Sequence, residues 1–248
     1  MFSGNAVNAN CSFWAQPDLQ QSLLSRRYQH TAKWLLRKRA GNRPGRIATC
    51  RPARAFISQE RLFKRGMMAK SSRPGEPLVL MFRDDGLIPN NPRLPFLVYL
   101  GAIDVAGADH PERVIESTFS ANGWGDMWRN GIFPYVHYHS MIHEALGIAR
   151  GRAKVRFGGE RGEVLELAPG DVAVLPAGTG HQCLSASPDL CVIGAYPKRG
   201  SYDLCRGSKA EHAKARKTVP EVPLPDSDPV HGKAGPLTTL WRKAPVAL

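Results

Sequence analysis

Two stretches of the chain decide the fold: residues 131–151 (GIFPYVHYHSMIHEALGIARG) and residues 170–185 (GDVAVLPAGTGHQCLS). The first contains His137, His139 and Glu144, and the second contains His181. Imidazole and carboxylate groups are the side chains that bind divalent transition metals. Three imidazoles and one carboxylate so close in the chain predict a metal site formed by His137, His139, Glu144 and His181.

Alternation along a strand indicates how the four groups meet. His137 and His139 are two residues apart, so on a strand both rings point to the same face. Glu144 has the opposite parity, so the chain must bend or bulge around residues 140–142 for Glu144 to join them. His181 follows a Pro/Gly turn at residues 176–180, and a neighbouring strand can bring it to the fourth ligand position.

The rest of this region predicts short strands joined by Gly/Pro turns. Strands are expected at residues 77–82, 96–105, 153–157, 172–175 and 191–196, with a half-buried alternation at 153–157. A hairpin connection is expected at 158–162, with Leu165 and Leu167 on the returning strand. Short helices are expected from Pro111 to about Asn122 and at residues 208–217. Residues 219–236 are Pro-rich and predicted to lie extended over the surface, with Trp241 as the terminal anchor. This pattern favours a small antiparallel barrel or sandwich.

At these residues the chain resembles the cupins, a family of small β-barrels with two sequence motifs. The first motif is Gly, five residues, His-x-His, three or four residues, Glu, six residues and Gly, and Gly131 to Gly151 match it at every interval. The second is Gly, five residues, Pro-x-Gly, two residues, His, three residues and Asn. Gly170, Pro176, Gly178 and His181 match it, whereas Ser185 stands where Asn is usual. Since that Asn is not one of the usual ligands, the departure leaves the metal site untouched.

The resemblance implies a fold and a ligand set. It implies an all-β protein with a single cupin barrel (a double-stranded β-helix, or jelly roll) and a few short helices. It implies that the four matching residues hold Fe, Mn, Ni or Zn as a divalent ion, and that two copies pair through their barrel edges. From about residue 77 to the end, the segments 122–125, 128–131, 228–229 and 235–237 also resemble a subgroup of uncharacterised bacterial cupins of the YjlB type.

The charge is concentrated at the beginning of the chain. The net charge is +13 over 248 residues, but residues 1–70 hold 14 Lys and Arg against only Asp18 and Glu60. We therefore expect a disordered basic extension over residues 1–66, a barrel domain over 67–200, and a helix and tail over 201–248 that pack on the barrel. A transit peptide and a nucleic-acid or membrane arm are the alternative interpretations of the extension. The nearly neutral remainder gives the folded domain no electrostatic support for binding nucleic acid.

Cysteine usage and hydropathy indicate the compartment. The five cysteines are odd in number, irregularly spaced and without a CxxC motif, which favours free thiols in a reducing compartment. No apolar run approaches the roughly 18 residues of a membrane span, and no secretory signal follows the start. The sequence therefore predicts a cytoplasmic protein with no membrane partner.

Several neighbouring residues have two interpretations. His143 forms HxxxH with His139, but it lacks the Glu of a zinc-protease motif, so we expect it to point away from the metal or to support a ligand. For Trp124 and Trp128 we favour packing at the barrel rim over lining a ligand pocket. Cys183 shares the parity of His181 and is expected to be a small core residue. Four further residues could each line a ligand pocket, and the sequence gives no reason to prefer one of them: Asp104, Tyr135, Tyr138 and Arg150.

These observations predict a metal-binding protein that takes a small molecule. A site with three histidines, one carboxylate and open positions suits a metal-dependent enzyme, and family analogy favours a dioxygenase-like reaction on a small oxygen-rich molecule. A metal-dependent isomerase and a non-catalytic small-molecule-binding protein are the alternatives. No catalytic base is visible in the sequence.

Overall fold

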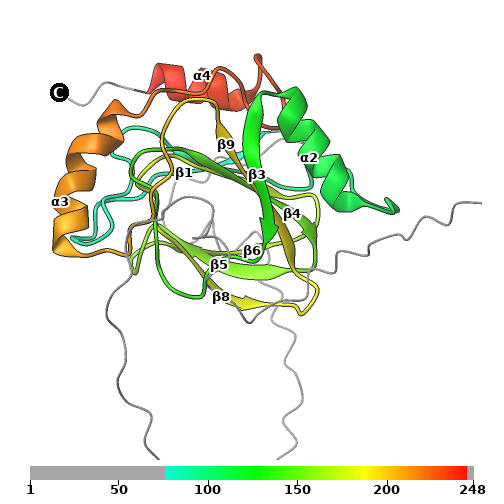
Figure 1. The fold of residues 1–248 in the computed structure, drawn as a ribbon, viewed down its shortest axis with the longest axis horizontal. Coiled ribbons are helices and arrows are strands. Elements are labelled where there is room, and N and C mark those ends of the chain that lie inside the picture. Colours follow the sequence, from blue (N-terminus) through cyan, green and yellow to red (C-terminus); the bar gives the residue numbers. More distant parts are fainter. Residues whose placement is uncertain (1–75, 245–248) are drawn as a thin grey trace, which may run out of the picture. The chain divides into compact units, whose positions relative to one another are not determined.

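The computed structural model describes residues 76–244, and these residues form two antiparallel β-sheets (Figure 1). The six-stranded sheet has the order β1-β2-β7-β4-β9-β3, and the three-stranded sheet has the order β6-β5-β8. The strands are β1 (Leu78–Leu80), β2 (Phe96–Tyr99), β3 (Trp124–Asn130), β4 (Glu144–Arg150), β5 (Ala153–Phe157), β6 (Glu163–Leu167), β7 (Val172–Leu175), β8 (His181–Ala186) and β9 (Cys191–Pro197). The predicted all-β cupin-like fold is confirmed.

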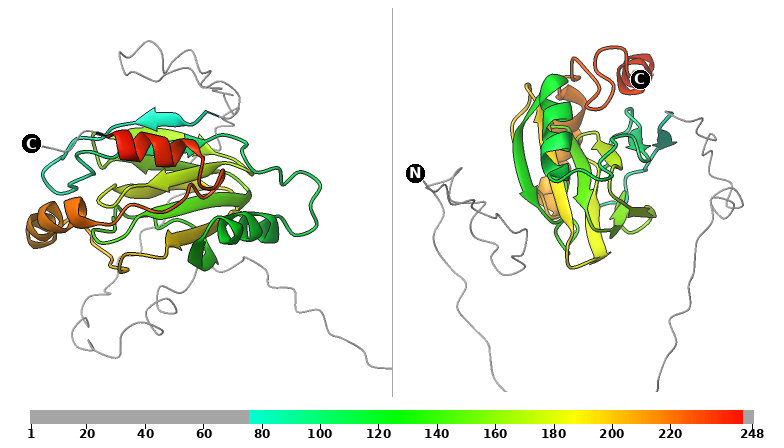
Figure 2. Two further views of the ribbon diagram at one scale, coloured as in Figure 1. Left: turned by 90° about the horizontal axis from the view of Figure 1, so that it is seen from above. Right: turned by 90° about the vertical axis from the view of Figure 1, so that its right-hand side faces the viewer.

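The helices lie outside the two sheets. Helix α2 (Pro111–Ala121) and helix α4 (Pro236–Lys243) cover the outer face of the six-stranded sheet, while α3 (Lys209–Thr218) and the short 3-10 turn η1 (Val219–Glu221) lie at one end of the barrel (Figures 1 and 2). A capping box starts α3: the Ser208 side chain accepts from the Glu211 N–H, and the Glu211 carboxylate accepts from the Ser208 N–H. No helix within residues 76–244 is long and apolar enough to cross a membrane.

Two hydrophobic cores explain why some strands are continuous apolar runs and others alternate between apolar and polar residues. An inner core fills the space between the sheets and includes Phe96, Leu146 and Val155, while an outer core lies between the six-stranded sheet and the helices. Strands β2, β7 and β9 of the six-stranded sheet are therefore buried on both faces and are continuous apolar runs. The three-stranded sheet has one wet face, so β5 and β6 alternate between buried and exposed residues.

Three sequence expectations need correction. The strand predicted for residues 96–105 ends at Tyr99, because Gly101 has a φ of +56° and its N–H donates to the Asp171 carboxylate at 2.7 Å, which turns the chain. Strand β3 was not predicted as a strand. Helix α4 was not predicted either, although Trp241 within it is the expected anchor: it is 2% exposed and its indole N–H donates to the Pro95 carbonyl at 2.9 Å. The basic extension at residues 1–66 lies outside the described residues.

Candidate metal centre

Backbone pairing brings His137 and His181 together. The His137 N–H donates to the His181 carbonyl at 3.1 Å, and the His181 N–H donates to the His137 carbonyl at 2.9 Å. This isolated antiparallel bridge joins the first motif to the start of β8 and sets the two ring centroids 3.9 Å apart. The two histidines predicted from separate motifs therefore share one point inside the barrel, although His137 lies in a bridge and not in a continuous strand.

The predicted bend between His139 and Glu144 is present, and Asp203 holds it. The Asp203 carboxylate accepts the Ser140 N–H at 2.8 Å, the Ser140 hydroxyl at 2.6 Å and the Met141 N–H at 3.2 Å. The bend resets the alternation, so Glu144 begins β4 with its side chain on the same side as His139. Asp203 lies more than 60 residues further along the chain, which is why neither motif contains it.

All three histidines have the same ring nitrogen engaged. The Nδ1 of His137 lies 3.2 Å from the Tyr135 carbonyl, that of His181 lies 3.3 Å from the Thr179 carbonyl, and that of His139 makes a short contact with the Asp203 carbonyl. A carbonyl only accepts, so each Nδ1 carries the proton and each Nε2 presents a lone pair. This is how outer hydrogen bonds orient metal-binding imidazoles.

The free ligand atoms converge with one carboxylate oxygen. One nitrogen from each of His137, His139 and His181 lies within 4.8 Å of the others. The Glu144 Oε2 lies 3.4 Å from the Nε2 of His181 and 3.6 Å from the Nε2 of His139. Each of the four residues is at most 5% exposed, and Glu144 Oε2 has no hydrogen-bond partner among the described residues. A buried carboxylate oxygen without a donor is costly, and a cation between these atoms would satisfy it.

The protonation states suit metal binding. Burial, followed by the charge of His139, lowers the pKa of His137 to about 3. Burial and the charges of His137 and His139 hold the pKa of His181 well below its ordinary value. Burial raises the pKa of Glu144, and His139 and the Tyr196 hydroxyl oppose that rise. The neutral imidazoles of His137 and His181 can therefore bind a divalent ion through their nitrogen lone pairs.

A hydrogen-bond chain orients Glu144 from inside the barrel. The Tyr196 hydroxyl, on β9, donates to Glu144 Oε1 at 3.0 Å and accepts from the Trp128 indole N–H at 2.9 Å. With Oε1 engaged in this way, Oε2 is the oxygen that faces the histidines. Trp128 thus acts on the site through Tyr196, whereas Trp124 is 2% exposed, packs in the outer core and donates to the Ser227 carbonyl at 3.0 Å.

Two tyrosines and an arginine lie beside the cluster. Tyr202 is 41% exposed, and its ring centroid is 5.0 Å from that of His139. Burial, then the charge of Glu144, raises the pKa of Tyr202 to about 12, so its hydroxyl is protonated at neutral pH. The Tyr135 ring lies 5.8 Å from His137 and carries the Arg206 guanidinium 4.3 Å from its centroid.

His143 does not belong to the cluster. It is fully buried on the outer side, its Nδ1 accepts the Ala177 N–H at 2.9 Å, and its ring lies 4.7 Å from Trp241. Burial lowers the pKa of His143 to about 3. The expectation that this histidine points away from the metal centre agrees with this placement.

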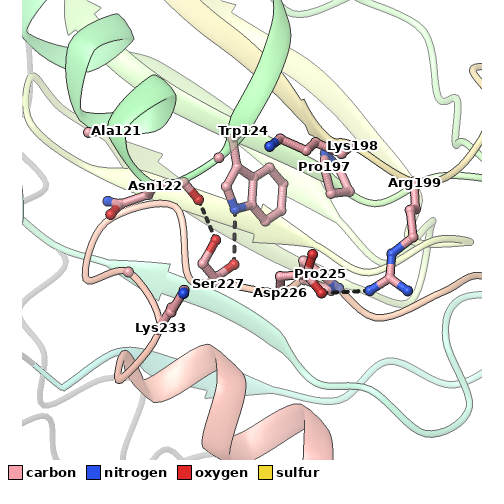
Figure 3. A pocket seen from close by; sticks show the side chains of 12 residues that line it. Ala121, Asn122, Trp124, Pro197, Lys198, Arg199, Pro225, Asp226, Ser227 and Lys233 are labelled. Atoms are coloured by element: carbon pink, nitrogen blue, oxygen red, sulfur yellow. Dashed lines mark hydrogen bonds and ion pairs between the residues drawn. The ribbon is translucent and has the colours of Figure 1, made fainter.

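The other candidates lie elsewhere. Cys183 packs in the inner core, and Tyr138 is buried against α3 and η1. Arg150 forms an ion pair with Glu112, and the Asp104 carboxylate accepts the Ala106 N–H. Ser185 lies opposite Lys154 in the three-stranded sheet. A separate cleft of about 260 Å³ lies between the start of β3, residues 197–199 and residues 225–233, and none of the four predicted ligands lines it (Figure 3). Figure 3 shows Arg199 paired with Asp226 at this cleft.

Sequence reasoning missed four residues that shape the site: Tyr196, Tyr202, Asp203 and Arg206. Only Tyr196 carried a usable signal, since it lies in the apolar run that was predicted to be a strand. The other three lie in a loop after β9, in a stretch that the sequence marks only as polar.

The chain is 42% identical over 168 residues to the uncharacterized protein YjlB of Bacillus subtilis, an alignment that covers 68% of this chain and 98% of YjlB. No family model matches the chain.

Solved structures give partial superpositions. Acireductone dioxygenase from Bacillus anthracis, with a cadmium ion in its active centre, is 16% identical and has a TM-score of 0.32, covering 42% of this chain and 80% of that one. A variant of oxalate decarboxylase from Bacillus subtilis is 14% identical and has a TM-score of 0.27, covering 47% of this chain and 29% of that one. Likenesses of this size carry no chemistry over to this chain. The extended identity to YjlB shows that the chain belongs to the family of YjlB, and its two antiparallel sheets form a cupin-like fold.

Proposed function

We propose that His137, His139, Glu144 and His181 hold one divalent transition metal, and that the protein is a metal-dependent enzyme acting on a small oxygen-rich molecule. The observation that carries the proposal is Glu144 Oε2, which is buried without a donor and faces two imidazole nitrogens. Three nitrogen donors and one carboxylate suit Fe, Mn, Ni or Zn. The histidines are already in the tautomer that binding needs.

The chain's own residues would prepare the site for a chelating substrate. Four protein ligands would leave room at a bound transition-metal ion for a molecule with two adjacent oxygens. Tyr202, at the exposed side of His139, presents a protonated hydroxyl that can donate to a substrate oxygen. Burial of the four ligands keeps bulk water from competing for them.

The proposed reaction class is dioxygenase-like. A bound ion would supply Lewis-acid polarisation and, if redox-active, the activation of O₂. The donor set of three imidazoles and one carboxylate supports this class. The reaction class is tested by O₂ uptake with candidate substrates: uptake should require the loaded metal and stop when a chelator removes it. Product formation without O₂ uptake would favour an isomerase.

Metal analysis tests the binding proposal. Wild-type protein purified from its native host should contain about one transition-metal ion per chain by elemental analysis, and His139→Ala should contain far less. His110→Ala is a matched control, because His110 is exposed and its side chain does not cap helix α2. Full metal occupancy in the His139→Ala protein would refute the ligand assignment.

A further inference from the structure

Arg206 is held one aromatic ring away from the proposed metal centre. Its guanidinium carbon lies 4.3 Å from the centroid of the Tyr135 ring, and its Nη2 donates to the Tyr135 hydroxyl at 3.2 Å. The Tyr135 ring is in turn 5.8 Å from the ring of His137 and stacks on Phe133 at 4.9 Å. Stacking and a hydrogen bond together fix an arginine that is otherwise exposed to solvent.

The positive charge of Arg206 is not neutralised by a neighbouring acid. Within residues 76–244, no carboxylate oxygen lies within 4.0 Å of its guanidinium. The two closest acids in sequence have other partners: Asp203 accepts from Ser140 and Met141, and Glu211 accepts the N–H groups of Arg206 and Ser208.

The charge balance around the site favours an anion. Three neutral imidazoles and one carboxylate leave a divalent ion with a net charge of +1, and Arg206 adds a further positive charge beside it. The Arg206 guanidinium lies over the Tyr135 ring, and that ring in turn meets the ring of His137 edge-on. The guanidinium is placed to bind a second group of a molecule that chelates the ion, and its planar fork matches a carboxylate.

We propose that the site takes a small anion with two ends: adjacent oxygens that chelate the metal, and a second acidic group that Arg206 binds beyond Tyr135. This inference names the substrate class of the proposed enzyme and rests on the proposed metal site. It predicts selectivity for hydroxy-dicarboxylates over hydroxy-monocarboxylates with the same chelating end.

A comparison of malate with lactate measures what the second acidic group contributes to binding. Both carry the same hydroxy-acid group, and only malate has a second carboxylate. Binding to Co²⁺-loaded protein is measured by the change in the visible absorption of the ion. Wild-type protein should bind malate about tenfold more tightly than lactate, as expected for one charge-assisted contact. In Arg206→Gln this preference should disappear while the affinity for lactate and the Co²⁺ content stay unchanged.

Two further variants control the result. Tyr135→Phe keeps the ring under Arg206 but removes the hydroxyl acceptor, so it should lose part of the malate preference. Arg199→Gln, at the separate cleft, should keep all of it. A malate preference that survives in Arg206→Gln, or that is absent from loaded wild-type protein, overturns the inference. Wild-type protein that takes up no Co²⁺ overturns the metal site itself, and metal analysis shows this before any anion is added.

Discussion

His139 and His143 are four residues apart and both are buried, yet they lie in two different regions of the molecule. His139 faces the inside of the barrel, with its Nδ1 against the Asp203 carbonyl and its Nε2 directed at Glu144. His143 faces the outer core, where its Nδ1 accepts the Ala177 N–H and its ring packs against Trp241.

The two histidines differ in the hydrogen-bond partner of Nδ1, which is a carbonyl for His139 and an N–H group for His143. A carbonyl at Nδ1 leaves a lone pair on Nε2, whereas an N–H donor at Nδ1 places the proton on Nε2. Only the first tautomer can bind a metal through Nε2. Burial of a histidine is therefore a poor guide to its role, and the partner of its second nitrogen is a better one.

The largest expected contrast is between His181→Ala and His143→Ala. His181→Ala removes a proposed ligand, so we expect metal affinity to fall at least 100-fold and the thermal stabilisation by added metal to vanish. His143→Ala leaves the Ala177 N–H without its acceptor and a gap beside Trp241, so it should lose about 2–4 kcal/mol of unfolding free energy. It should still be stabilised by metal in a thermal-shift titration. A His143→Ala protein that no longer binds metal would break the contrast.

The next contrast compares two buried tyrosine hydroxyls, one from each region. Tyr196→Phe removes the hydrogen bond that orients Glu144, so we expect metal affinity to fall about 10- to 100-fold by competition with a chelator. Tyr99→Phe removes a hydrogen bond to Asp228 in the outer core, and should cost about 1–2 kcal/mol of unfolding free energy with unchanged metal affinity. Equal metal affinities in the two variants would show that Tyr196 has no positioning role.

A third contrast concerns the bend that delivers Glu144. Asp203→Ala removes the carboxylate that accepts from Ser140 and Met141, while the backbone carbonyl that contacts His139 remains in the chain. We expect metal affinity to fall about tenfold, because the bend is no longer held in one geometry. Asp226→Ala, which breaks only an exposed ion pair at the separate cleft, is the matched control. Equal metal affinities in the Asp203→Ala and Asp226→Ala proteins would show that the bend does not need the Asp203 carboxylate.

The smallest expected effect lies in the outer region and depends on pH. Burial alone would raise the pKa of Glu112, but its hydrogen bond and ion pair with Arg150 outweigh burial and hold that pKa below its ordinary value. A lowered folded-state pKa stabilises the fold above the ordinary pKa of about 4.5. That stabilisation is lost as the pH falls further. Glu112→Gln should therefore lose at most about 1 kcal/mol at pH 7, and the difference from wild type should shrink towards pH 3 in urea titrations. A difference that grows on acidification would contradict the assigned direction.

Much of the fold could be predicted because local sequence rules agree with it. The alternation at residues 153–157 and the Pro-initiated helix at Pro111 follow from burial on one face and from fixed proline geometry. The strand predicted to continue past Tyr99 and the missed β3 show where these rules fail. In β3 only Trp124 is buried, so the strand lacks a clear alternation and its pairing with β9 is set by contacts distant in sequence.

In the candidate site, too, the residues that depend on contacts distant in sequence could not be predicted. His137, His139, Glu144 and His181 could be predicted because the motif spacing places them around one bend and one bridge. Asp203, Tyr202 and Arg206 could not, because they reach the site from a loop after β9 whose backbone pairs with the first motif at Cys205–Tyr138 and Ser201–Met141. Long-range pairing of this kind leaves no periodic signal in one sequence.

The central claim is that four side chains on the inside of the barrel bind one ion while the buried His143 binds none. Anomalous diffraction from crystals grown with a saturating divalent transition metal tests it directly. The account predicts one strong peak about 2.0–2.2 Å from the Nε2 atoms of His137, His139 and His181 and from a Glu144 carboxylate oxygen. A peak at His143, or no peak among these four side chains at full metal saturation, would contradict it.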